Sequence, residues 1–135
     1  MLDKIIFKGF EVTSSEYNEY KDAEGGKFRV LFDHYKLLQD ADDDGNREII
    51  IEAAPSINGY SEDGEDEDDL AFKVKIALRL YFDFESDRDM TEDECSKNSW
   101  FFDNFVSIAT KLTVESTLKH TSIKSIELPW SRPKK

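Results

Sequence analysis

The segment "FKVKIALRLYFDF", residues 72–84, decides the fold class, because every even-numbered residue in it is apolar. These residues are Phe72, Val74, Ile76, Leu78, Leu80, Phe82 and Phe84. Most of the odd-numbered residues are charged or polar, and such a period of two is typical of a β-strand with one buried and one solvated face. The segment therefore predicts a single long strand of roughly 40 Å.

Three earlier segments also have the composition of strands, at residues 4–13, 27–38 and 47–57. Gly9 lies in the middle of the first segment and predicts a bulge or bend there. The second segment switches the face of its apolar side chains, which also predicts a bulge. Pro55 limits how far the third can pair as a central strand. With the short connections between them, these segments predict a four-stranded antiparallel sheet arranged as a meander.

After residue 85 the apolar period changes from that of a strand to that of a helix. The stretch "SWFFDNFVSIATKLTVESTLKH" at 99–120 predicts one long helix with apolar side chains at helical spacing: Phe101, Phe102, Phe105, Ile108, Ala109 and Leu112. Before it, residues 91–94 have the form of a capping box, which predicts a short additional helix. The fold class is therefore α+β, with one long helix and one or two short ones packed on one face of the sheet.

The net charge of −12 is concentrated in two acidic segments, residues 40–44 and 62–69, which supply −11 of it. The rest of the chain is nearly neutral, so electrostatics disfavour nucleic acid or an anionic membrane as a partner. The connection at 58–70 is too self-repelling for compact structure and is expected to be a flexible loop. Solubilisation is the simplest role for it, and docking of a basic partner through residues 61–69 is the alternative.

The segment "DADDDGNREIIIE" at 40–52 resembles a calcium-binding loop in its alternating aspartates. A calcium loop of the EF-hand type needs a bidentate Glu at its twelfth position, where this chain has Ile51. Its flanks have the composition of strands, whereas the calcium loop needs a helix on each side. The segment is therefore predicted to be a turn between two strands, with no metal site.

Catalytic constellations are missing from the sequence. Cys95 is the single cysteine, and neither His34 nor His120 has a nucleophile and an acid at a suggestive spacing. There is no phosphate-binding glycine loop and no metalloprotease motif. We therefore expect a protein that is not an enzyme and has no cofactor. No apolar run approaches the ~20 residues of a membrane span, so a soluble cytoplasmic protein without membrane insertion is expected.

The element order resembles that of the SecB-like family of protein-export chaperones, with four strands followed by a long helix that begins with aromatic residues. The most specific part is "NSWFFDNFVSIATKLTVESTLKHTSIKSIELPW" at 98–130, which ends in the Leu-Pro pair found after that helix in the family. The resemblance implies a single domain over residues 1–135, with a short basic tail at 131–135. It also implies dimers that pair into a dimer of dimers, and the binding of unfolded or nascent polypeptides in apolar grooves without ATP.

Carried onto this chain, the resemblance places client contacts at the start of the helix and at the seam between helix and sheet. The candidates are Trp100, Phe101, Phe102, Phe105 and Trp130, together with Tyr81 on the solvated face of the sheet. Packing in the core is the alternative for each of them.

The sheet strand departs from the family, because it exposes Lys73, Lys75 and Arg79 where SecB has an acidic patch for the motor SecA, and docking to SecA is not expected. The second hypothesis is an oligomeric scaffold with one folded partner, associated with a phage or a toxin–antitoxin system.

Overall fold

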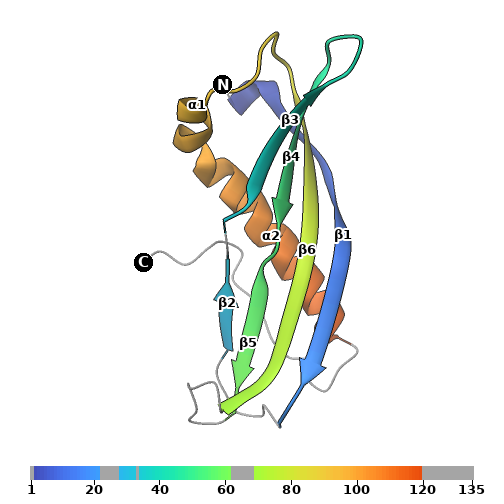
Figure 1. Cartoon of the computed structure of the whole chain (residues 1–135), viewed down its shortest axis with the longest axis vertical. Helices are drawn as coiled ribbons and strands as arrows, with labels where there is room; N and C mark the ends of the chain where they lie inside the picture. Colours follow the sequence, from blue (N-terminus) through green and yellow to red (C-terminus); the bar gives the residue numbers. More distant parts are fainter. Residues whose placement is uncertain (1, 22–27, 33, 62–68, 120–135) are drawn as a thin grey trace.

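The computed structural model describes residues 2–21, 28–32, 34–61 and 69–119 (Figure 1). In this part of the chain one antiparallel sheet is covered on one face by a long helix. The strands are β1 (Ile5–Glu19), β2 (Phe28–Leu31), β3 (Lys36–Ala41), β4 (Arg47–Ala53), β5 (Ser56–Tyr60) and β6 (Leu70–Phe84). A 3₁₀ turn, η1 (Leu2–Lys4), precedes them, and the helices α1 (Glu92–Lys97) and α2 (Ser99–Leu118) follow. The α+β class is thus confirmed.

The central strand is β6, which pairs along its length with β1 on one side. On the other side β4 pairs with one half of β6 and β5 with the other half, while β3 and β2 continue outward from β4 and β5. The six strands described therefore occupy four positions in the sheet, which we call runs. The first run is β1, the second is β2 with β3, the third is β4 with β5, and the last is β6.

The predicted meander is wrong in one respect, because the first run lies beside the last run and not beside the second. This is a Greek-key order. The 15 residues of β1 pair with β6 from Phe72 to Phe84, nearly the whole of one side of that strand.

The sequence predicted three irregularities in the strands, and the structure shows two of them as predicted. The register of β1 shifts between Phe7 and Gly9, and Gly9 has a φ of 140°, so the predicted bulge is confirmed. Pro55 separates β4 from β5, and its carbonyl accepts a hydrogen bond from the N–H of Ile76 at 3.2 Å. The second run, expected to continue through a bulge, is instead broken between β2 and β3. A further register shift in β1, between Val12 and Ser14, was not predicted.

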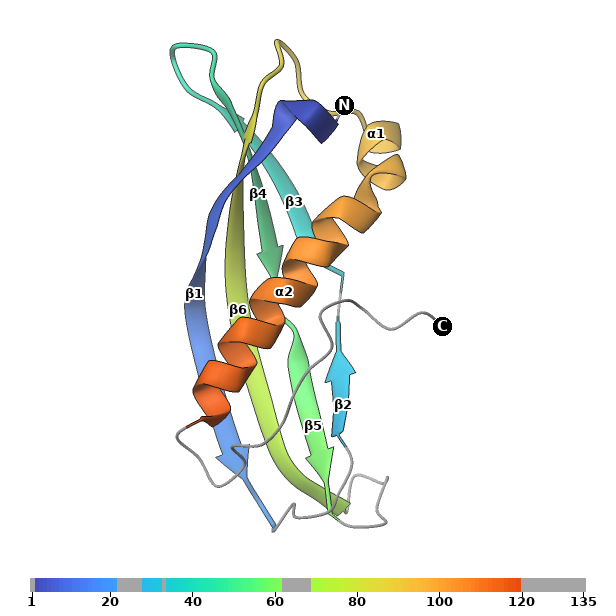
Figure 2. The same ribbon diagram turned by 180° about the vertical axis from the view of Figure 1, so that it is seen from behind.

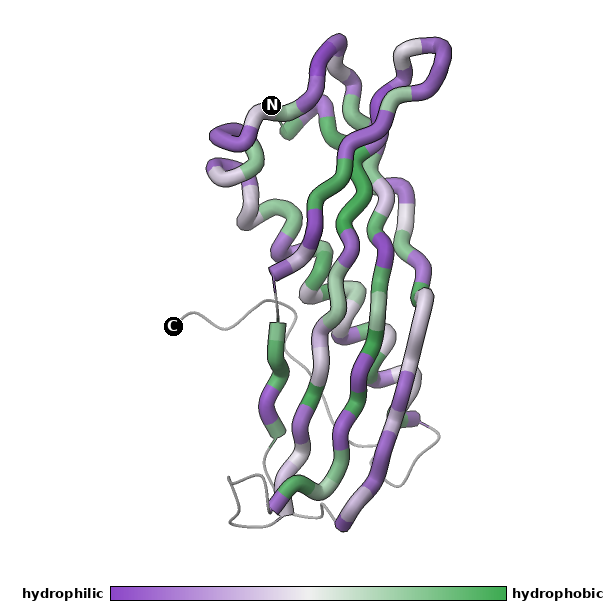
Figure 3. The backbone as a smooth tube through the Cα atoms, viewed as in Figure 1, coloured by the Kyte–Doolittle hydropathy of each residue, from purple (hydrophilic) through white to green (hydrophobic). Residues whose placement is uncertain are grey.

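The two faces of the sheet follow the period of two in β6. Its even-numbered apolar residues from 72 to 84 are 0–3% exposed and are on the face that α2 crosses diagonally (Figure 2). Val106, Ala109, Val114 and Leu118 of α2 complete this core. Along β6 in Figure 3 the hydropathy of the chain alternates, as expected for a strand with one wet face. We call the side without the helix the open face.

Side-chain hydrogen bonds to the backbone fix the connection between β6 and α1. Gln39 of β3 makes two hydrogen bonds with the backbone of Met90, accepting from its N–H at 2.7 Å and donating to its carbonyl at 3.0 Å. The predicted capping box is present, because the Thr91 hydroxyl accepts from the N–H of Glu94 and the Glu94 carboxylate accepts from the N–H of Thr91. This arrangement fixes α1 and with it the start of α2.

The end of the acidic segment, residues 42–44, lies in the hairpin turn at 42–46 between β3 and β4, as predicted, while Asp40 belongs to β3. The Asp42 carboxylate accepts hydrogen bonds from the N–H groups of Asp44 at 3.0 Å and Asn46 at 2.8 Å, which lowers the pKa of Asp42. No group of three or more acidic, histidine or cysteine side chains is placed to hold a metal ion among the described residues.

The predicted acidic loop at 58–70 is shorter than expected, since residues 58–60 belong to β5 and residue 70 begins β6. Its residues 62–68 lie outside the described part of the chain, as does the basic tail. None of the helices described is long and apolar enough to cross a bilayer.

Candidate functional site

A cluster of aromatic rings joins the start of α2 to the sheet. Phe82 of β6 lies at its centre, with ring centroids 5.3 Å from Phe102, 5.4 Å from Phe105 and 6.1 Å from Phe101. Phe7 of β1 adds a fifth ring, 5.3 Å from Phe82 and 4.5 Å from Phe105. Several of these pairs are edge-to-face, a favourable geometry for aromatic rings. The cluster therefore fixes the position of α2 on the sheet.

Exposure rises from the centre of this cluster to the surface. Phe102 is fully buried, Phe101 and Phe105 are half-buried, and Trp100 is 55% exposed. The indole of Trp100 packs edge-to-face on Phe101 at 6.2 Å. An exposed indole supported by half-buried rings is the kind of feature that anchors protein–protein contacts, because further burial of apolar area gains about 25 cal/mol per Å². We call Trp100, Phe101 and Phe105 the aromatic surface.

Three of the six sequence candidates are not part of the aromatic surface: Phe102 is buried beneath it, and Tyr81 and Trp130 lie elsewhere in the chain. Tyr81 lies on the open face, where its hydroxyl donates to the Glu11 carboxylate at 2.6 Å and where that bond raises the pKa of Tyr81. Arg79 beside it pairs with Glu52 at 3.1 Å and Glu11 at 3.9 Å. Tyr81 is therefore on the other side of the sheet from Trp100. Trp130 lies outside the described residues.

A second apolar feature, the seam groove, lies between β1 and α2, with a volume of about 310 Å³. Phe10 and Val12 of β1 line it, with Leu112 of α2 opposite them. Val12 is 44% exposed and Leu112 is 47% exposed. Ser15 and Thr117 close the groove through a hydroxyl contact of 3.3 Å. Sequence analysis placed Leu112 on the buried stripe of the helix, and Val12 gave no signal beyond its place in a strand.

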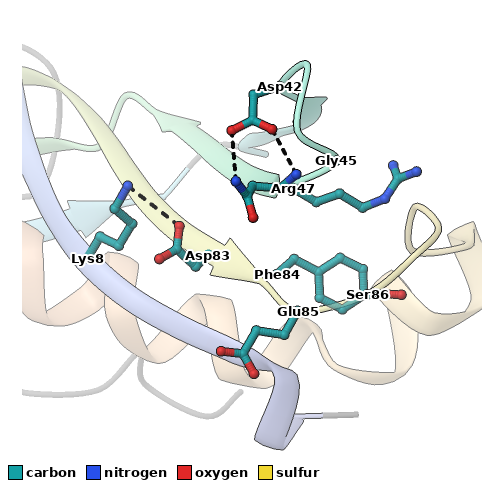
Figure 4. A pocket seen from close by; sticks show the side chains of 9 residues that line it. Lys8, Asp42, Gly45, Arg47, Asp83, Phe84, Glu85 and Ser86 are labelled. Atoms are coloured by element: carbon teal, nitrogen blue, oxygen red, sulfur yellow. Dashed lines mark hydrogen bonds and ion pairs between the residues drawn. The ribbon is translucent and has the colours of Figure 1, made fainter.

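A polar hollow of about 550 Å³ lies at the hairpin end of the open face (Figure 4). Lys8 enters it from β1 and contacts Glu48 at 3.4 Å and Asp83 at 3.5 Å, which raises the pKa of Lys8. Arg47 forms an ion pair with Asp89, and the Asp42 carboxylate accepts a hydrogen bond from the N–H of Asn46 in the same turn. Lys8, Arg47 and Asp42 therefore stabilise the strands and turns that carry them.

The sheet and the helix that crosses it have the arrangement of a known fold, the SecB-like fold. Among solved structures, the SecB-like chaperone Rv1957 of Mycobacterium tuberculosis, in complex with a ChAD peptide from the HigA1 antitoxin, matches with a TM-score of 0.73. The match covers 98% of this chain and 95% of the other chain, with 12% sequence identity. No protein-family model and no curated protein sequence matches the chain. The likeness is thus one of fold.

Proposed function

We propose that the protein is an ATP-independent chaperone that binds unfolded or nascent polypeptide segments through the aromatic surface. The observation that carries the proposal is the exposed Trp100, packed on Phe101 at the start of α2 in a SecB-like fold. Phe102 supports this surface from below, and Trp130 stays a predicted contact. No catalytic constellation competes with this function, so the proposal is for a non-enzymatic protein.

The chemistry of the aromatic surface suits varied clients. Apolar burial needs no specific hydrogen-bond partner, so an extended chain gains free energy wherever its own apolar side chains reach the rings. The net charge of −12 adds an attraction for basic clients, which speeds their encounter at low salt. The proposal places this activity in the cytoplasm, in keeping with a single free cysteine, Cys95. Docking to SecA is not part of it.

An aggregation assay tests the proposed function. A chemically denatured client is diluted into buffer with and without the protein, in the absence of nucleotide, and light scattering is followed. We expect suppression near stoichiometric ratios and no change when ATP is added. An unrelated folded protein at equal mass is the control. Scattering that stays unchanged at a several-fold excess of the protein would contradict the proposal.

A narrower function is favoured by one observation, namely that the solved neighbour holds a peptide from an antitoxin. In this second proposal the protein is an oligomeric scaffold that serves one dedicated partner. Capture of the tagged protein followed by mass spectrometry distinguishes the two. Many unrelated clients support the general chaperone, whereas one partner in stoichiometric amount supports the scaffold. Both proposals include self-association into a dimer or a dimer of dimers.

A further inference from the structure

The short helix α1 leads into the aromatic surface, and apolar packing holds it only weakly. None of its six residues is fully buried, whereas eight residues of α2 are. Cys95 packs against the core but stays half-buried. Figure 2 shows α1 at the start of α2, on the same side of the molecule as β3. The position of α1 therefore depends on its polar contacts.

The side-chain amide of Gln39 ties the chain in front of α1 to the sheet. Gln39 faces Ile49 in the ladder, so it is on the helix side of β3. Its amide accepts from the N–H of Met90 at 2.7 Å and donates to the carbonyl of Met90 at 3.0 Å. Both hydrogen bonds are partly buried, and the Met90 side chain is 4% exposed. Loss of this amide would leave two backbone groups unpaired in a place with little water, which is costly.

The other polar contacts near α1 are local or exposed. Arg88 pairs with Glu94 at 2.6 Å, which stiffens α1 but joins residues only six positions apart. Arg47 of β4 pairs with Asp89, whose side chain is 59% exposed. Exposed ion pairs contribute little to stability. The amide of Gln39 is therefore the strongest tie between α1 and the sheet among the contacts described.

The other end of α1 leads directly into Trp100. At the junction, the backbone N–H and the side-chain amide of Asn98 both donate to the carbonyl of Glu94, at 3.1 and 2.8 Å. The hydroxyl of Tyr35, which precedes β3, donates to the carbonyl of Ser99 at 3.4 Å. A long side chain on a helix leans back over the preceding turn, so the Trp100 indole leans toward this junction. The direction of α1 thus sets the space around the indole.

We propose that Gln39 is a positioning residue for client binding, because its amide holds α1 where the Trp100 indole is exposed but restrained. The inference rests on the proposed function and names a residue outside the aromatic surface that sets the affinity of that surface. A restrained anchor binds more tightly than a mobile one, because less order has to be gained on binding. Loss of the Gln39 amide therefore weakens binding although the rings of the aromatic surface are all retained.

The variant Gln39→Met tests the inference through affinity. It keeps the length of the side chain and removes both hydrogen bonds to Met90. We expect the affinity for a labelled unfolded polypeptide to be about fivefold weaker, as for the loss of a pre-ordered contact. The matched control is Asp42→Ala, which removes hydrogen bonds from a side chain to the backbone at the other end of β3. It should lower stability and leave the affinity unchanged, with each variant measured at the same interval below its own melting temperature.

The fluorescence anisotropy of Trp100 gives a readout that a general loss of stability would not change. In a Trp130→Phe background, Trp100 is the single tryptophan. Gln39→Met should lower its anisotropy, because the indole moves more freely on the nanosecond timescale, and Asp42→Ala should not.

The outcomes separate this inference from the proposed function. If the parent binds unfolded polypeptide, then parent-like affinity or parent-like anisotropy in Gln39→Met would overturn the inference. Equal changes in Asp42→Ala would overturn it as well. A fall in anisotropy in a protein that binds no unfolded polypeptide would remove the proposed function while supporting the link between Gln39 and Trp100.

Discussion

At the scale of single residues, the ring of Phe72 of β6 occupies the space beside Gly59 of β5, the residue that it faces in the ladder. A Cβ on Gly59 would lie 1.9 Å from a ring carbon of Phe72. Phe72 is buried, so its ring has little room to move. Gly59→Ala should therefore lower the free energy of unfolding by about 3 kcal/mol, at the upper end of the usual cost of overpacking. Urea titration measures this. Ser56→Ala, in the same strand on the open face, should stay within about 0.5 kcal/mol of the parent.

Glu94 carries the clearest dependence on pH. The Arg88 guanidinium, together with the N–H of Thr91, lowers the pKa of Glu94 from 4.5 to about 2. A folded-state pKa below the unfolded value means that the stabilising effect is present above pH 4.5 and is lost as the pH falls toward 2.

Glu94→Gln should therefore lower the melting temperature at pH 7 and reduce the fall in melting temperature between pH 5 and pH 2. Asp103→Asn, an acidic residue of α2 outside the capping box, is the control and should keep the parent's profile. Equal slopes for Glu94→Gln and the parent would contradict the role assigned to the capping box.

At the scale of elements, Phe82 links β6 to α2 and β1. Phe82→Ala removes a fully buried ring that contacts the rings of four other residues, and such truncations cost about 3–5 kcal/mol. Chemical unfolding followed by circular dichroism measures the loss. Phe82 also contacts Phe101 and Phe105 of the aromatic surface, so the proposed client binding should weaken as well. Phe82→Leu should recover most of the stability, since it refills much of the cavity.

The strand at 72–84 was predictable because its period of two continues over its whole length, and each face of the observed strand follows that pattern. The capping box and α2 were also predictable, because both are recognised from the spacing of residues that are close together in the sequence. The partner of β1 was not, because pairing between the first and last runs depends on matched length and not on any local motif. The break between β2 and β3 was predicted as a bulge. A break and a bulge cannot be told apart from the sequence, because each moves the later apolar side chains to the other face of the sheet.

The candidate site was predictable in part. The aromatic run at 100–105 lies at the start of α2, as expected, but sequence spacing could not separate the buried Phe102 from the exposed Trp100, which are two residues apart. Tyr81 lies on the open face with Glu11, as its odd position in β6 predicted, and is therefore separated by the sheet from the aromatic surface. Val12 was missed, because its exposure results from β1 being an edge strand.

At the scale of the whole molecule, the structure has two unlike sides. The helix side carries the aromatic surface and the seam groove, and the open face carries networks such as Arg79 with Glu11 and Glu52. The proposed polypeptide binding is assigned to the helix side, because apolar side chains there are exposed next to half-buried rings. The open face still exposes Leu38, at 44%, among charged neighbours. Leu38 thus provides a natural control of similar character on the opposite side.

The most direct test of the central claim is the affinity for a permanently unfolded, fluorescently labelled polypeptide, measured by anisotropy without nucleotide. Trp100→Ala should weaken binding by about tenfold or more, as expected for a central aromatic anchor, while circular dichroism and the melting temperature stay near those of the parent. Leu38→Ala should bind as the parent does. Equal affinities for the parent and Trp100→Ala, or an equal loss in Leu38→Ala, would contradict the assignment of polypeptide binding to the aromatic surface.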